Sequence, residues 1–288
     1  MIIITDERCL DYAAPDHPER PARIAGTLAK LRGQRQIPVT WAEPFQVREE
    51  QVLRAHSPAH LHHVLSTTDD FEGDTPWFHD VAEHAWRSAG GALRAQQAAR
   101  AGDLAFSLMR PPGHHATRGH AMGFCYFNNV AIAALEALAQ DVERVAVFDF
   151  DVHHGNGTEA ILLSHPRAAT FSVHQYPCYP GTGTENIGNN AFNYPVAPLT
   201  PACNHRCVLA QALEDLKNFR PSLVAVSAGF DAYLKDPIAQ EMLQVEDFHW
   251  LGEQIRKLSL PTFSVLEGGY SDDLPELVLA YLCGLAGR

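Results

Sequence analysis

The sequence lacks any uncharged apolar run long enough to cross a membrane, which takes about 20 residues, and it is poor in basic residues. Its first residues, MIIITDE, contain neither the basic segment nor the long apolar segment of a secretion signal. We therefore expect a cytoplasmic protein. Its 22 lysines and arginines stand against 34 acidic residues, a formal net charge of -12, which opposes direct binding to nucleic acid or to an anionic membrane.

Cysteine is sparse as well. The six cysteines are scattered through 288 residues and do not form the dense framework that holds small secreted domains together. Only Cys203 and Cys207 lie close in sequence, and their separation fits no common zinc ribbon. The composition, 46% hydrophobic and 19% charged, suits a globular protein with a large core, which we expect to be one domain spanning residues 1–288.

From about residue 100 onward, the sequence alternates short β-branched runs with amphipathic segments. Strands that are apolar on both faces and alternate with helices indicate a parallel sheet covered on both sides. The sequence therefore predicts an α/β fold with three layers, α/β/α, around a mostly parallel central sheet. The expected strands are 104–108, 144–150, 168–173, 222–228 and 261–267, and the expected helices are 128–140, 204–219 and 245–258.

The first hundred residues are expected to be mainly helical. One helix should begin with Ser57 as its N-cap and Pro58 in its first turn. Two segments rich in Gly, Pro and His, 109–127 and 174–196, are predicted to be loops. Loops of this length in a compact domain are usually functional.

Polar and reactive side chains follow the predicted strands. In an open parallel sheet, binding sites gather at the carboxyl ends of the strands, so segments that follow different strands are expected to meet there. These segments are MRPPGHHATRGHAMGF after LAFSL, DFDVHHGNG after RVAVF, GFDA after SLVAVSA and GGY after PTFSVLE.

A metal site is the first hypothesis for this edge. Asp149, Asp151 and His153 would share one face of a strand, because side chains alternate across it. Burying two like charges is costly unless a cation neutralises them, and carboxylates with an imidazole suit a divalent metal such as Zn²⁺. Asp231, at the end of a neighbouring strand, is a candidate further ligand. A buried salt-bridged network that only holds the loop is the alternative.

The segment PPGHH strengthens the metal hypothesis. Pro111, Pro112 and Gly113 constrain the loop that presents His114 and His115, so the two histidines cannot both be core residues. A single histidine would more often be a satisfied core residue. Two adjacent histidines that face a candidate metal site favour catalysis.

Together, these segments resemble the histone deacetylase family, within the arginase and deacetylase fold. The matches occur in the family's order and cover nearly the whole chain. DVHHGNGT and EGGY are closer to the class II branch and its bacterial relatives than to class I. The matching segments are HPERPARI (17–24), RPPGHHA (110–116), GFCYFNNVAIAA (123–134), DFDVHHGNGT (149–158), FSVHQYPCYPGTG (171–183), SAGFDA (227–232) and EGGY (267–270).

The resemblance implies two bound ions. The catalytic ion, Zn²⁺ or alternatively Fe²⁺, would be held by Asp151, His153 and Asp231, with a water in the open position. A structural K⁺ would lie nearby, bound partly through main-chain carbonyls. The residues implied for the K⁺ site are Asp149, Asp151, His153, Ser172 and Val173.

The resemblance also implies catalytic roles. His115 would act as general base toward the water and then as general acid toward the leaving amine, with His114 as its electrostatic partner. Tyr270 would donate a hydrogen bond to the developing oxyanion. Asp149 would orient His114, and Asn156 would hold His115. Many family members have Asp where Asn156 stands, and a neutral amide stabilises an imidazolium less, so we expect a lower His115 pKa than in those members.

A narrow substrate channel is implied, with Gly123, Phe124 and Tyr179 as its walls. Tyr179 stands where many relatives have Phe, so its hydroxyl is expected at the rim. Gly268 and Gly269 would leave room for a closely packed loop beside the channel.

Three further residues are interpreted through the resemblance. Arg23 would line an internal pocket beyond the metal, and Asp74 would grip a substrate backbone at the channel mouth. Either charge can equally be a surface feature. His154 is expected to be structural.

Several substrates fit this family. The leading hypothesis is removal of acetyl or other acyl groups from lysine side chains of peptides or proteins, and the alternative is deacetylation of a small acylated amine such as a polyamine. Polyamine-selective relatives carry an acidic gatekeeper where this chain has Ile238, in KDPIA. A catalytically silent acyl-lysine-binding protein and an arginase-like ureohydrolase are less favoured, because His115 and Tyr270 are present and the ligands of a two-metal cluster are not supplied. The oligomeric state and the acyl preference stay open.

Overall fold

The computed structural model describes residues 1–163 and 165–288. Its centre is one eight-stranded sheet in which every neighbouring pair is parallel, in the order β2-β1-β3-β8-β7-β4-β5-β6. The strands are β1 (Ile2–Ile4), β2 (Thr40–Ala42), β3 (Ala105–Ser107), β4 (Val145–Asp149), β5 (Ala168–Gln175), β6 (Ala191–Val196), β7 (Leu223–Ala228) and β8 (Thr262–Leu266).

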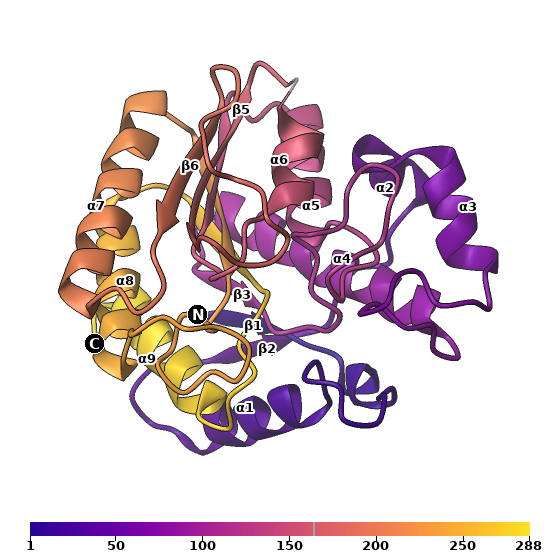
Figure 1. Ribbon diagram of the computed structural model, residues 1–288, viewed down its shortest axis with the longest axis horizontal. Coiled ribbons are helices and arrows are strands. Elements are labelled where there is room, and N and C mark those ends of the chain that lie inside the picture. The colour runs from indigo at the N-terminus through magenta and orange to yellow at the C-terminus, as the bar shows by residue number, and fades with distance from the viewer. Residues whose placement is uncertain (164) are drawn as a thin grey trace.

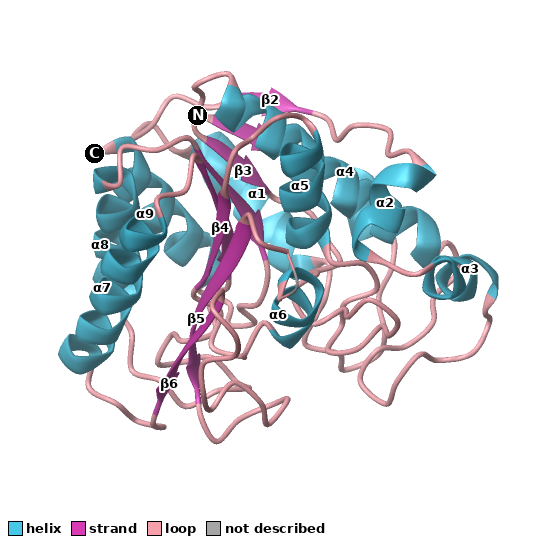
Figure 2. Cartoon of the chain, turned by 90° about the horizontal axis from the view of Figure 1, so that it is seen from above, coloured by secondary structure: helices cyan, strands magenta, loops and turns pink. Residues whose placement is uncertain are grey.

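Helices cover both faces of the sheet (Figures 1 and 2). A short 3-10 helix, η1 (Glu7–Leu10), precedes them. The α-helices are α1 (Ala22–Gly33), α2 (Glu49–Ala55), α3 (Pro58–Ser66), α4 (Val81–Arg100), α5 (Asn129–Ala139), α6 (Asn156–Leu162), α7 (Ala202–Phe219), α8 (Val245–Lys257) and α9 (Leu274–Ala286).

The alternation of side chains along the strands divides the core into two halves. On β4, Ala146 and Phe148 pack into the cluster that includes α1, α7, α8 and α9, whereas Val145 and Val147 pack into the cluster that includes α2 to α6. Figure 2 shows the sheet edge-on between α7, α8 and α9 on one side and α4, α5 and α6 on the other. The predicted three-layer α/β/α fold is therefore confirmed.

The five predicted strands correspond to β3, β4, β5, β7 and β8, and the three predicted helices to α5, α7 and α8. The Ser57 cap is also confirmed, since its side chain accepts a hydrogen bond from the His60 backbone N–H. β1, β2, β6, α6 and α9 were not predicted, and η1, α1 and α2 were covered only by the expectation of a mainly helical first hundred residues. β6 lies within the segment 174–196, which was predicted to be entirely loop. The polar Asn193 and the proline Pro195 interrupt the apolar pattern that would have indicated a strand.

The outer edge of β6 is closed by its own loop. The Ala191 N–H donates to the Ile187 carbonyl at 3.2 Å, and the Asn193 N–H donates to the Asn186 side-chain oxygen at 2.7 Å. Pro195 has no N–H to offer. An edge strand normally presents a row of free donors to other chains, and on β6 these donors are occupied or absent.

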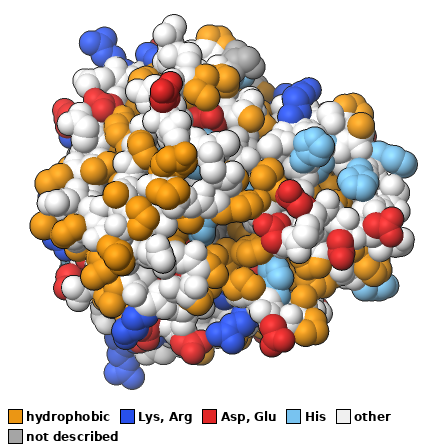
Figure 3. Space-filling model, viewed as in Figure 1, with side chains coloured by type: hydrophobic (Ala, Val, Ile, Leu, Met, Phe, Trp, Pro, Cys, Tyr) orange, Lys and Arg blue, Asp and Glu red, His pale blue; other side chains and the backbone are white. Residues whose placement is uncertain are grey.

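The surface mixes several kinds of side chain. On the face shown in Figure 3, hydrophobic side chains gather on the side of α7 and β6, and histidine and acidic side chains on the side of α2 and α3. Within residues 1–163 and 165–288, no helix combines the length and the hydrophobicity that a membrane crossing requires.

Helices α8 and α9 approach each other closely through two glycines. A Cβ atom at Gly284 would lie 2.0 Å from the His249 carbonyl oxygen, and one at Gly252 would lie 2.3 Å from the Tyr281 carbonyl oxygen. Any larger side chain at either position must push the two backbones apart. The loop after β8, which carries Tyr270, leads directly into this helix pair, because α9 begins shortly after Tyr270.

We expect Gly284→Ala to destabilise the protein by about 1–3 kcal/mol, the usual cost of overpacking a core. The measurement is the urea concentration at the midpoint of unfolding. Gly33→Ala is the matched control, since a Cβ there meets nothing within 4 Å, and its midpoint should be unchanged or slightly higher. A Gly284→Ala midpoint equal to that of the control would mean that the helices separate without cost.

Candidate active site

Four adjacent strands bring the reactive residues together. In the order β3-β8-β7-β4, the loop after each strand carries, respectively, the two histidines of PPGHH, the GGY segment, Asp231 and the DVHHGNG segment. All four loops leave the carboxyl edge of the parallel sheet. The predicted meeting point of these segments therefore exists.

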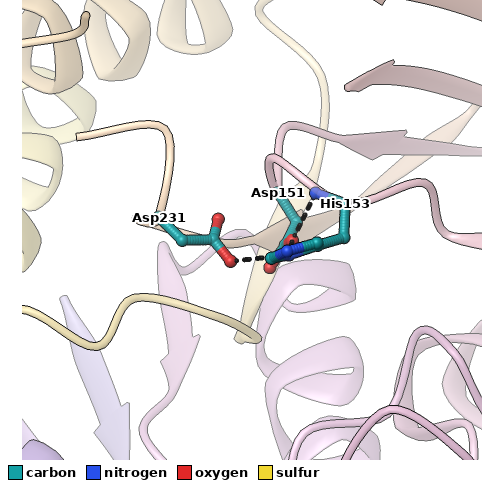
Figure 4. A group of neighbouring side chains, drawn as sticks. All are labelled: Asp151, His153 and Asp231. Atoms are coloured by element: carbon teal, nitrogen blue, oxygen red, sulfur yellow. Dashed lines mark hydrogen bonds and ion pairs between the residues drawn. The ribbon is translucent and has the colours of Figure 1, made fainter. Parts of the chain in front are cut away.

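Asp151, His153 and Asp231 form a buried cluster (Figure 4). The Nδ1 atom of His153 lies 3.2 Å from Asp151 Oδ1 and 3.1 Å from Asp231 Oδ2. One ligand atom from each residue lies within 4.8 Å of the others. Two carboxylates and an imidazole at such distances match the donor set of a divalent metal site.

Backbone amides orient both carboxylates of the cluster. Asp231 Oδ1 accepts from the Val152 N–H at 2.9 Å, and Asp151 Oδ2 accepts from the Gly268 N–H at 2.7 Å. Fixed second contacts of this kind are typical of metal ligands. The remaining carboxylate oxygens face His153.

The prediction that Asp149, Asp151 and His153 share one strand face is wrong. Strand β4 ends at Asp149, so Asp151 and His153 lie in the turn that follows and do not share a strand face with it. The Asp149 side chain accepts the Asp151 N–H at 3.1 Å and shapes that turn. Its other oxygen, Oδ2, contacts His114. The strand pattern identified the right residues, but side-chain hydrogen bonds to the backbone bring them together.

Glycines form the floor of the site. A Cβ atom at Gly229 would lie 2.0 Å from Asp151 Oδ2, and one at Gly268 would lie 2.1 Å from Asp231 Oδ2. At Gly155 it would lie 2.2 Å from Asp149 Oδ2. Only glycine leaves space for the carboxylates at these positions. Gly229 and Gly155 were not singled out from the sequence, although they lie within the segments SAGFDA and DFDVHHGNGT.

The two histidines of PPGHH differ in their partners. His114 Nδ1 lies 3.1 Å from Asp149 Oδ2, and His115 Nδ1 lies 2.8 Å from Asn156 Oδ1. The ring centroids of the two histidines are 3.9 Å apart. His114 therefore has a carboxylate partner and His115 a neutral one, as the sequence interpretation assigned them.

These surroundings move the two imidazole pKa values in opposite directions. Burial disfavours protonation of His114, but Asp151 and Asp149 outweigh it and raise its pKa to about 10. Burial, followed by the charges of His114 and His153, lowers the pKa of His115 well below its usual value, although its hydrogen bond to Asn156 acts in the opposite sense. That the pKa of His115 is lower here than in relatives with Asp in place of Asn156 stays a prediction.

Glu267, which the sequence interpretation did not assign, holds the histidine loop in place. Its Oε2 accepts from the Gly113 N–H at 2.6 Å and from the His114 N–H at 3.1 Å. Burial raises its pKa to about 7. A glutamate at the end of an apolar strand was the available signal, because such a residue needs partners across the fold.

Tyr270 is held from two sides. Its backbone N–H donates to Asp236 Oδ2 at 2.7 Å, and the Arg23 guanidinium lies 4.7 Å from the centroid of its ring. Arg23 is 4% exposed and donates to the carbonyls of Gly269 at 2.7 Å and Glu267 at 2.5 Å. Arg23 is thus a buried brace for the GGY loop, and it is not among the residues that line the cavity described next.

A cavity of about 200 Å³ opens above the cluster. His115 and Tyr179 meet in it at 5.1 Å between ring centroids, and Phe124 and Tyr270 at 5.7 Å. Asp74 lies at its edge, where its Oδ1 accepts from the Gly123 N–H at 3.1 Å. The lining residues are Asp74, His115, Gly123, Phe124, His153, Tyr179, Ile238 and Tyr270.

The remaining candidate residues lie around this centre. Ser172 pairs with Asp149 in the register of β4 and β5, next to Val173, and its hydroxyl lies 2.9 Å from His174 Nδ1. Gly269 has φ +113°, a backbone conformation that favours glycine. His154 is buried, and its Nδ1 lies 2.7 Å from the Thr182 hydroxyl.

Comparison with known proteins agrees with this arrangement. A family model described as the histone deacetylase domain matches residues 17–285. A probable deacetylase of Archaeoglobus fulgidus is 34% identical over 99% of this chain and 86% of its own length. The histone deacetylase-like amidohydrolase of Pseudomonas aeruginosa is 37% identical over 95% of this chain and 76% of its own. The crystal structure of an acetylpolyamine aminohydrolase from Burkholderia pseudomallei matches with a TM-score of 0.91 and 28% identity, over 99% of this chain and 98% of that one.

The parallel sheet, with its buried carboxylate and imidazole cluster at the carboxyl edge, places the protein among α/β proteins of the arginase and deacetylase fold. Within that fold, the chain belongs to the histone deacetylase family, whose members here include deacetylases and amidohydrolases, hydrolases that act on amides.

We expect the wild-type chain to bind one divalent ion and Asp231→Ala to lose it, because the variant removes one of the three candidate ligands. Metal content per chain after dialysis is the measurement. Asp272→Ala, at an exposed position, is the control and should keep the wild-type content. Full metal retention by Asp231→Ala would contradict the ligand assignment.

Proposed function

We propose that this protein is a metal-dependent deacetylase that hydrolyses the amide of acylated lysine side chains. The observation that carries the proposal is that His153, His115 and Tyr270 all line one cavity. A candidate metal ligand, a candidate base and a hydroxyl donor thus face the same small volume. The family match over residues 17–285 supports one catalytic domain for the whole chain.

The residues of the cluster suit a catalytic ion. Two buried carboxylates lie side by side, and such a pair is costly without a cation. Zn²⁺ is the proposed ion, and Fe²⁺ is the alternative, held by Asp151, His153 and Asp231. When bound, such an ion lowers the pKa of water and polarises a carbonyl.

His115 is the proposed general base. Its Nδ1 faces Asn156, so its Nε2 is the atom left for proton transfer in the cavity. The lowered pKa of His115 keeps the imidazole neutral and able to accept a proton from water. The same nitrogen then returns the proton to the leaving amine. His114, with Asp149 as its carboxylate partner, is the proposed electrostatic partner of His115.

Tyr270 is the proposed oxyanion donor. Within the described chain its hydroxyl has no hydrogen-bond acceptor, whereas its backbone is fixed through Asp236 and its ring through Arg23. A donor that is oriented before reaction stabilises the developing negative charge without reorganisation. We also propose the K⁺ site near β4, with Asp149, the main-chain carbonyls of Asp151 and His153, and Ser172 and Val173.

The second candidate substrate is a small acylated amine. Two observations favour it: a similar structure is that of an acetylpolyamine aminohydrolase, and Asp74 places a carboxylate at the cavity edge. Against it, Ile238 is apolar and lines the same cavity, so one side of the mouth offers no countercharge to a second ammonium group.

Turnover of acyl-lysine peptides and acetylated polyamines, each with and without a chelator, tests the proposed metal-dependent deacetylase function. Activity that survives complete removal of metal would overturn it.

We expect Tyr270→Phe to keep its metal and its fold while losing about a hundred- to a thousandfold in turnover, the usual effect of removing one oxyanion donor. Steady-state kinetics on an acetyl-lysine peptide, with KM and kcat measured separately, check this. Tyr176→Phe, at a surface position outside the cavity, should match wild type. Near-normal turnover of Tyr270→Phe would assign oxyanion stabilisation to another group.

We expect acyl-lysine peptides to exceed acetylated polyamines in kcat/KM, because an unpaired ammonium in a partly desolvated channel is costly. Ile238→Glu should narrow the gap by improving polyamine turnover. Ile187→Glu places the same charge at an exposed site outside the cavity and should leave the ratio unchanged. A wild-type preference for acetylputrescine or acetylspermidine over every peptide would contradict the substrate assignment and leave the hydrolytic mechanism intact.

A further inference from the structure

Asp236 is a buried carboxylate to which neither the sequence motifs nor the proposed reaction assigns a role. It lies between Asp231 and α8 and is 7% exposed. Its two oxygens have different partners: Oδ2 accepts from the Tyr270 N–H at 2.7 Å, and Oδ1 accepts from the Ile238 N–H at 3.2 Å. Tyr270 and Ile238 both line the catalytic cavity. One carboxylate therefore bonds to the backbone of two of its walls.

A tight turn presents the Asp236 side chain. The Asp236 N–H donates to the Tyr233 carbonyl at 2.9 Å, and Pro237 restricts the backbone that follows. The bond from the Ile238 N–H to Oδ1 is the one that an aspartate makes to the residue two positions on. With Oδ1 fixed in this way, the carboxylate has one orientation, and Oδ2 faces Tyr270.

Tyr270 has space to move on more than one side. Gly268 and Gly269 precede it, and Gly269 adopts φ +113°. Besides the catalytic cavity, Tyr270 borders two outer hollows of about 500 Å³ and 370 Å³. Its ring is contacted by Arg23 and Phe124. The packing around the ring therefore leaves room for other positions, and the backbone of Tyr270 has to be held by other means.

Asp236 supplies the bond to the Tyr270 backbone itself. Arg23 donates to the carbonyls of Glu267 and Gly269, which fixes the loop before Tyr270. The Tyr270 N–H is bonded to Asp236. An oxyanion donor works only when it is aimed before the reaction, and a misplacement of about 1 Å can cost about a hundredfold in rate. The place of the Tyr270 hydroxyl thus depends on this contact.

We propose that Asp236 is a positioning residue, which holds Tyr270 at a fixed place relative to the channel wall at Ile238. The inference rests on the proposed deacetylase function. Asp236 is not among the residues that line the catalytic cavity, so it acts on the reaction through Tyr270.

Asp236→Asn is the first test. Asparagine keeps the volume but has one acceptor oxygen and one donor group, so one of the two N–H groups loses its acceptor. On an acetyl-lysine peptide, kcat should fall about tenfold or more, KM should change much less, and the metal content should equal that of wild type. Asp247→Asn is the matched control, because Asp247 is also buried and accepts the Gln244 N–H at 2.6 Å, away from the cavity. It should keep wild-type kcat.

Asp236→Ser keeps the test available if Asp236→Asn does not fold. A serine hydroxyl can accept the Ile238 N–H in the same kind of turn, but it offers no second oxygen to Tyr270. The turn should therefore persist while kcat falls as in Asp236→Asn.

A double-mutant cycle separates positioning from general support of the fold. In a Tyr270→Phe background the hydroxyl is gone, so adding Asp236→Asn should lower kcat by less than about twofold, whereas two independent effects would multiply. Wild-type kcat in both Asp236 variants, or the same loss in both backgrounds, would overturn the positioning role and leave the proposed function intact. A metal-loaded wild-type chain that hydrolyses no acylated amine would overturn the proposed function and this inference with it.

Discussion

The burial of four carboxylates at one edge of the sheet is the constraint on which the rest of the site depends. Asp149, Asp151, Asp231 and Glu267 are each at most 2% exposed. Like charges in such surroundings are tolerated only when donors or cations surround them. Backbone amides from the loops after β3, β4 and β8 supply those donors here. The loops are therefore held in place by the same charges that prepare the site for a cation.

This constraint connects distant parts of the chain. Arg23, from α1, donates to the carbonyls beside Tyr270, and Glu19 holds both Arg23 and the fully buried Arg110. Arg110 in turn directly precedes the PPGHH segment. One buried network of two arginines and a glutamate therefore braces both the loop that carries the candidate base and the loop that carries the candidate oxyanion donor.

Much of the fold was predictable, because the central strands are apolar on both faces and long enough to stand out. β1 and β2 have three residues each and lie in the first hundred residues, which were expected to be mainly helical, and β6 carries polar residues at a sheet edge. At the site, the residues with distinctive chemistry were found from motifs. Glu267 and Asp236 were not, because their role is to accept amides from segments far away in the sequence, and no local pattern records such a contact. Gly229 was missed for the same reason. Only a residue without a Cβ fits at this position, and that requirement arises only once Asp151 packs against it.

The closed outer edge of β6 limits how this molecule can join others. With its outward N–H groups bonded to residues 186–187 or replaced by a proline, the strand offers no free N–H donor to a ninth strand from another copy. Growth of the sheet into a continuous ribbon, the first step of many aggregates, is blocked at that end. Any assembly that forms there has to be built from side-chain contacts.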